Sequence, residues 1–240
     1  FGAVGKLLEQ VGYDPETTLE IFGSAYSDAQ KLANQNVAAA KGFAETTKEM
    51  LKNPSKIGHA AVESAPLMLA GGAIGKATKL APLVAGAIGE AAVSAGMTAE
   101  QIRGEGESGF LSPKQSGISV VSGAMTGLLA LAGGRVAKKL GIADVDTMLA
   151  GGGIKKTKAG IAKSIVGGGI TEGWFEELPQ SAQEQVWMNA ATDKPLLSGV
   201  PESAVQGALV GTLVGGTANI ANVATPKSKA KELLINPGEE

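Results

Sequence analysis

Apolar and small residues recur at intervals of three and four over residues 14–53, which predicts one long amphipathic helix. Asp14 suits an N-cap, Pro15 suits the first helical position, and the Asn53-Pro54 step suits the end of the helix. At about 1.5 Å per residue such a helix is roughly 60 Å long. A thin, alanine-rich apolar stripe of this length favours packing on other long helices. We interpret the stripe as a self-assembly seam, whose larger members are Leu19, Phe22, Tyr26, Val37 and Leu51.

Alanine, glycine, leucine and valine dominate residues 57–97. Pro66 and Pro82 interrupt this stretch, which predicts short, kinked helices. A polar, glycine-rich loop is expected over 103–112, with a new helix beginning at Pro113.

Two later segments, 115–134 and 203–226, carry no charged residue over 20 and 24 positions. Both lengths suit a bilayer-spanning helix. Their glycine, serine, threonine and asparagine content makes them only marginally hydrophobic, however. From sequence alone, each segment could be either a buried helix of a soluble protein or a membrane-inserted helix.

Glycines recur every four residues inside both uncharged segments and so fall on one face of each predicted helix. This spacing lets a second helix approach closely, either in or beside a membrane or within a soluble helical protein. The two segments also resemble each other, which indicates either a duplicated helical hairpin or a shared composition. The candidate helix-packing or membrane-insertion residues are Gly123, Gly127, Gly207, Gly211 and Gly215.

Four side chains that share a spacing of four, Glu172, Glu176, Gln180 and Glu184, would line one face of a helix capped by Thr171. The simpler interpretation is that they form a solvent-exposed helical face, because acidic side chains are stabilised near the N-terminus of a helix. The alternative is a carboxylate pair for sugar cleavage. Pro179 is expected to kink or split this helix.

The composition of the chain limits the kinds of catalytic and metal site that it can form. The chain has no cysteine and one histidine, which disfavours thiolate, zinc and Ser/His/Asp sites, so no cofactor, metal or catalytic residue is expected. A net charge of −2 disfavours a dedicated nucleic-acid binder, although lysines over 138–163 allow non-specific contact with DNA or acidic headgroups. The chain begins at Phe1 without a leader pattern, and we expect it to be a piece of a longer polypeptide.

We therefore expect an all-α, elongated helical array without a sheet. Its expected parts are a long helix (1–54), a Gly/Ala-rich helical block (55–134), a basic linker (135–170), a second helical hairpin (171–225) and a charged tail (226–240).

The stretch EGWFEELPQSAQEQ, followed by PESAVQGALVGTLVGG, resembles segments of the large ejection proteins of short-tailed bacteriophages. The likeness covers about 57–223. It implies a homo-oligomeric protein stored in the virion interior with other ejection or portal/core proteins. It further implies release into the host envelope and assembly there into a membrane-contacting conduit for the genome.

Some members of that family carry a lytic transglycosylase domain. The Glu-Ser pairs at Glu63, Glu107 and Glu202 lack the glycine-rich, aromatic surroundings of its catalytic glutamate, so enzyme activity is expected elsewhere in the full-length protein. The alternatives are a pore-forming or holin-like membrane toxin, a peptidoglycan-cleaving fragment that uses Glu172 or Glu176, and a soluble scaffold within the virion.

Overall fold

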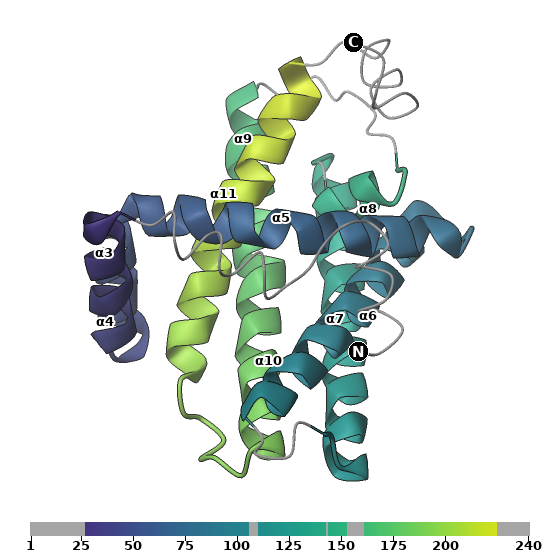
Figure 1. Ribbon diagram of the computed structural model, residues 1–240. Coiled ribbons are helices and arrows are strands. Elements are labelled where there is room, and N and C mark those ends of the chain that lie inside the picture. Colours follow the sequence, from purple (N-terminus) through teal and green to yellow (C-terminus); the bar gives the residue numbers. More distant parts are fainter. Residues whose placement is uncertain (1–26, 106–109, 143, 153–160, 225–240) are drawn as a thin grey trace.

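The computed structural model describes residues 27–105, 110–142, 144–152 and 161–224, and these ranges contain helices and connecting turns but no strand (Figure 1). The all-α prediction is confirmed for this part of the chain. The elements are α3 (Asp28–Ala39), α4 (Gly42–Lys52), α5 (Pro54–Ala77), α6 (Pro82–Glu105), α7 (Pro113–Leu140), α8 (Val145–Leu149), α9 (Ile161–Ile170), the π-helix η1 (Thr171–Glu177), α10 (Leu178–Ala191) and α11 (Val200–Ala224).

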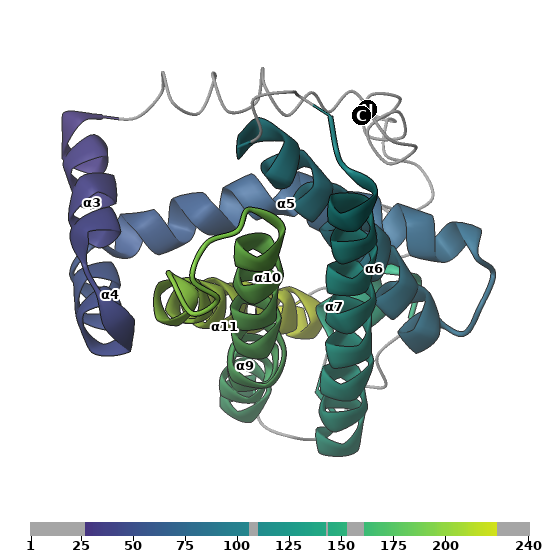
Figure 2. The same cartoon turned by 90° about the horizontal axis from the view of Figure 1, so that it is seen from below.

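Two antiparallel helical pairs form the body of the protein. The first pairs α6 with α7, and the second pairs the continuous run of α9, η1 and α10 with α11. The pairs meet where α10 packs beside α7, while α5 packs on α6 and crosses α11 (Figure 1). Figure 2 shows α3 and α4 together at one end of α5.

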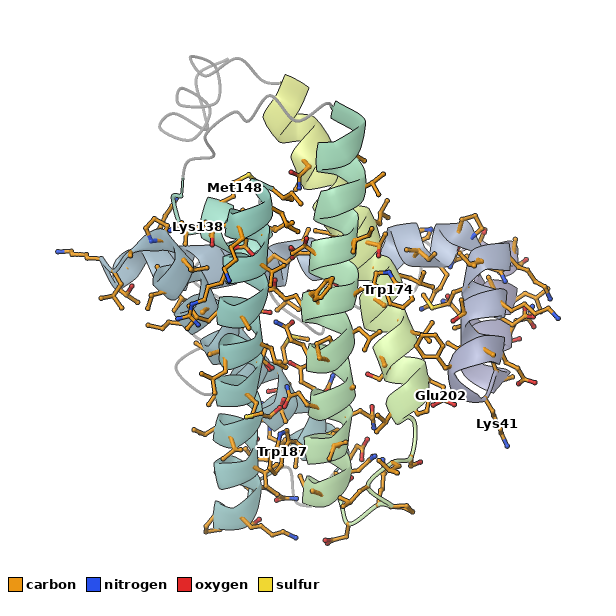
Figure 3. The ribbon with its side chains drawn as sticks, turned by 180° about the vertical axis from the view of Figure 1, so that it is seen from behind. Lys41, Lys138, Met148, Trp174, Trp187 and Glu202 are labelled. Carbon is orange, nitrogen blue, oxygen red and sulfur yellow. The ribbon has the colours of Figure 1, made fainter. Side chains whose placement is uncertain are left out.

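The prediction of one continuous helix over 14–53 is wrong in the part that the structure describes, because α3 ends at Ala39 and α4 begins at Gly42. Gly42 has a φ of +76°, and its N–H donates a 2.5 Å hydrogen bond to Glu202. Figure 3 labels Glu202, at the start of α11, and Lys41, the residue before Gly42. The turn lets Val37 of α3 and Met50 of α4 enter one apolar cluster with Val205 of α11. Burial of that cluster outweighs the continuity of a single helix.

The proposed self-assembly seam is therefore divided. Val37 is buried inside the protein, whereas Leu51 is 61 % exposed, so the two do not form one stripe. The other three seam residues, Leu19, Phe22 and Tyr26, lie outside the described residues.

The turn at Gly42 gives a first prediction. A Cβ at this position would meet nothing within 4 Å, so only the left-handed backbone opposes a side chain. We expect Gly42→Ala to lower the free energy of unfolding by about 1 kcal/mol in chemical denaturation. Gly58→Ala is the control, because Gly58 is equally unobstructed but helical, and it should raise stability by about 0.5–1 kcal/mol. Equal effects of the two substitutions would contradict this account.

The expected short helices over 57–97 are also wrong. Helix α5 runs for 24 residues through position 66, and Pro82 begins a second 24-residue helix instead of interrupting one. Glycines let these helices approach closely: a Cβ at Gly89 would lie 2.7 Å from the carbonyl carbon of Gly71. Such contact stabilises helices that local propensity alone would break.

The next helix begins at Pro113, as predicted, and Ser112 and Gln115 form a capping box around its start. The described parts of the expected linker, 135–170, hold the end of α7, the short α8 and all of α9.

Candidate functional site

The glycines of α7 bring its backbone against α6. A Cβ at Gly123 would lie 2.7 Å from the backbone nitrogen of Ala95, and one at Gly127 would lie 2.6 Å from the carbonyl oxygen of Ala87. Real Cβ atoms do not tolerate such distances to backbone atoms. Both glycines therefore face protein, and each is required for the spacing of the α6–α7 pair.

The second pair repeats this arrangement. A Cβ at Gly207 would lie 2.7 Å from the carbonyl oxygen of Glu177, and one at Gly211 would lie 2.9 Å from the Cα of Gly173. Gly215 is as close to the backbone of Gly168. Each proposed packing glycine thus lies at a backbone-level contact between helices.

Helix α7 has an inverted distribution of residues. Every buried residue of this helix is small or carries a hydroxyl group, whereas several of its large aliphatic and thioether side chains are exposed and the others are only partly buried. The exposed group is Val120, Val121, Met125, Leu128 and, at the last position of the helix, Leu140. The buried group is Ser119, Ser122, Gly123, Thr126, Gly127, Ala130, Gly133, Gly134 and Ala137.

Helix α6 shares part of this pattern, since it buries Ser94 and Thr98 but leaves Val84, Ile88 and Met97 partly exposed. By length and composition, α6 and α7 are both capable of crossing a membrane, and fewer than half of the residues in their most apolar windows are buried. The uncharged segment 115–134 lies within α7. The other, 203–226, largely coincides with α11, which does not meet the same criterion within its described residues.

The interior between α6, α7 and α10 has an apolar part, where Ile102, Met188 and Ile118 pack together, and a polar part. The Glu184 carboxylate accepts hydrogen bonds from the hydroxyls of Ser94 (2.5 Å) and Thr126 (2.7 Å), and the Gln183 amide donates to the Thr126 hydroxyl (2.8 Å). Buried hydrogen bonds of this kind fix the relative positions of three helices.

The expectation of a solvated acidic face is wrong. Glu172 is 3 % exposed, Glu176 is 1 % exposed and Gln180 is also buried. Thr171 does not cap a helix but lies inside one, and its hydroxyl donates to the carbonyl of Gly167. The π-helix η1 ends just before Pro179, which occupies the first turn of α10, so the chain changes helical geometry where Pro179 was expected to kink or split it.

Two further elements bring carboxylates to Glu172 and Glu176. Helix α6 contributes Glu90, the short α8 contributes Asp146, and the N-cap residue of α8 is Asp144. One oxygen from each of Glu90, Asp146 and Glu176 lies within 4.8 Å of the others, and the same holds for Asp144, Glu172 and Glu176. We call this group of five residues the carboxylate cluster. None of the ion pairs within the described part of the chain involves a member of it.

Glycines of α7 make the space for this cluster. A Cβ at Gly133 would lie 2.9 Å from the carboxyl carbon of Glu176, and one at Gly134 would lie 3.2 Å from a carboxylate oxygen of Asp144. Gly133 and Gly134 therefore leave room for carboxylate side chains.

Burial dominates the electrostatics of η1. It raises the pKa of Glu176 well above its usual range, and the nearby Glu172 carboxylate raises that pKa further. Burial similarly raises the pKa of Glu172, with Asp146 as the next contributor. Burial raises the pKa of Asp146 to about 6 and that of the adjacent Glu177 to about 8.

Sequence reasoning singled out Glu172 and Glu176 but not Asp144 or Asp146, which fell in the expected linker. One signal was present: Glu90 is the only charged residue between Pro82 and Thr98. An isolated acid within a long apolar helix indicates a buried, functional position.

Comparison with known proteins found no matching family model, no matching curated protein and no matching solved structure.

Proposed function

We propose that this chain is a membrane-competent structural module of a phage ejection protein. In this proposal the module is stored in the virion, and copies of it assemble with other ejection or portal/core proteins into a conduit across the host envelope. It has no enzymatic role of its own. The phage assignment rests on the resemblance of the EGWFEELPQSAQEQ stretch and the glycine helix after it.

The inverted residue distribution of α7 is the observation that carries membrane competence. In water, burial of aliphatic side chains is the main stabilising term, and a helix normally turns them inward. In lipid that driving force between helices disappears, and small and hydroxyl-bearing residues at the helix contacts become favourable. Helix α7 places Ser122, Gly123 and Thr126 inward and Val120, Val121 and Leu128 outward, which matches the second case.

The polar part of the interior allows the same fold to exist in both settings. A module stored in a capsid must avoid aggregation, and later it must expose apolar surface to a bilayer. The α6–α7 pair is held by glycine contacts and hydroxyl hydrogen bonds instead of a large aliphatic core. It therefore can enter lipid as a preformed unit without turning its residues around.

Vesicle flotation tests this proposal with a pair of matched variants. We expect the purified chain to float with neutral and with anionic liposomes, and to remain bound at high salt, because insertion is apolar. Leu128→Glu should abolish salt-resistant flotation by placing a charge on the outer face of α7. Leu51→Glu, at an equally exposed leucine of α4, should leave flotation unchanged.

Absence of flotation in every condition, or an equal loss in both variants, would contradict membrane insertion through α7. A chain that ignores lipid but forms rings would support the soluble virion scaffold instead. Dye release from vesicles by the isolated chain would favour the pore-forming alternative, since a conduit module should need its virion partners to open a passage.

A further inference from the structure

We propose that the carboxylate cluster is a binding site for a hard divalent cation, with Glu176 as its central ligand. The site joins α6, α8 and η1 through Glu90, Asp144, Asp146, Glu172 and Glu176. This inference does not depend on the membrane proposal, because the ligands meet inside the protein and not on its outer face.

The environment of the Glu176 carboxylate is the strongest evidence that the cluster binds a cation. Its side chain is almost completely buried, yet neither of its carboxylate oxygens has a hydrogen-bond partner. An ordinary buried carboxylate accepts hydrogen bonds, as Glu184 does from Ser94 and Thr126 only two turns along the chain. An unsatisfied buried carboxylate is costly unless something neutralises it. Both potential ligand sets include Glu176, so a cation there would satisfy the residue that most lacks a partner.

The residues around the carboxylate cluster also accommodate its side chains. The absence of a side chain at Gly133 leaves space for the Glu176 carboxyl group, and the Asp144 carboxylate caps α8 by accepting a hydrogen bond from the N–H of Thr147 (2.8 Å). The three contributing elements come from distant parts of the sequence. A cation would hold them together, and none of the ion pairs among the described residues does so.

The donor set selects the class of cation. All ligands are carboxylate oxygens, with no imidazole or thiolate, which favours Ca²⁺, Mn²⁺ or Mg²⁺ over Zn²⁺ or Cu²⁺. Mg²⁺ retains several waters and dehydrates reluctantly, whereas Ca²⁺ accepts several protein carboxylates in flexible geometry. Burial of Glu172 and Glu176 therefore favours Ca²⁺ and Mn²⁺ over Mg²⁺.

The test uses Mn²⁺ as the probe. The whole 240-residue chain, stripped with a chelator, is titrated with Mn²⁺ at pH 7.5 while free ion is followed by electron paramagnetic resonance. We expect saturable binding that Ca²⁺ displaces, together with a rise in thermal midpoint. Glu176→Gln, which preserves shape but removes a charged ligand, should weaken Mn²⁺ binding at least tenfold.

Glu184→Gln is the matched control. Glu184 is also an acidic residue of the same helical run, but it lies outside both ligand sets and already accepts two hydrogen bonds, so binding should be retained. Asp146→Asn is a second ligand variant, in case Glu176→Gln fails to fold. Absence of saturable Mn²⁺ binding in the folded wild-type chain would overturn the proposal. Equal binding by wild type and both ligand variants would also overturn it.

Discussion

Gly127→Leu is expected to separate α6 from α7 and to lower the free energy of unfolding by about 3 kcal/mol or more. The Cβ alone would lie 2.6 Å from the carbonyl oxygen of Ala87 and 2.7 Å from the Cβ of Ala91. A backbone carbonyl inside a helix cannot move aside as a flexible side chain can. The whole leucine side chain could enter only if the two helices moved apart, which would also break the Ser94–Thr126 contact (3.0 Å).

Gly117→Leu provides the matched control on the same helix. A Cβ at Gly117 would meet nothing within 4 Å, so only the change in helix propensity acts, and stability should rise by about 0.5–1 kcal/mol. Thermal unfolding followed by circular dichroism measures both variants. If Gly127→Leu unfolded at the wild-type temperature, the close α6–α7 contact would not exist in solution.

The second large effect concerns pH. With chelator present, we expect the stability of the wild-type chain to fall as the pH rises from 5 to 8. The folded pKa values of Glu172, Glu176 and Glu177 are raised, so the folded state binds more protons than the unfolded state through this window. Their stabilising contribution is complete below the unfolded pKa, near 4.5, and is lost as pH rises toward the folded pKa, which for Glu177 is about 8. Each such carboxyl contributes a slope of about 1.4 kcal/mol per pH unit.

Glu176→Gln isolates one of these carboxyls. At pH 5 the variant and the wild type should unfold at similar denaturant concentrations, because Glu176 is protonated and neutral in the folded wild type. At pH 8 the variant should be the more stable of the two, since it has no carboxyl to deprotonate or to keep protonated. Chemical denaturation at both pH values measures the difference. A difference independent of pH would show that Glu176 is solvated in the folded protein.

The helix-packing glycines could be predicted from sequence because their cause is local. A spacing of four residues places Gly123 and Gly127 on one helical face whatever the tertiary structure, and an uncharged stretch of 20 residues around them predicts a buried or inserted helix. The sequence could not identify the helices against which these glycines pack. In the structure, Gly123 and Gly127 pack against α6, whereas Gly207 and Gly211 pack against η1 and α10.

The break at Gly42 could not be predicted for the opposite reason. The chain around it has a good helical pattern, and the turn is stabilised by a hydrogen bond to Glu202, 160 residues away. The carboxylate cluster was missed for a similar reason. Asp144 caps and Asp146 lies in a helix of five residues, which is too short to produce a periodic signal. The π-helix also shifts the face on which Glu172 and Glu176 lie.

The most direct test of the central claim is the depth of α7 in a bilayer. Because the chain has no cysteine, one cysteine introduced at Leu128 or Leu51 is a unique site for an environment-sensitive fluorophore. On addition of liposomes, we predict a blue shift at position 128 and quenching by a quencher attached to the lipid acyl chains, with neither at position 51. Emission from position 128 that stays characteristic of water while the protein is bound to the vesicles would contradict insertion of α7.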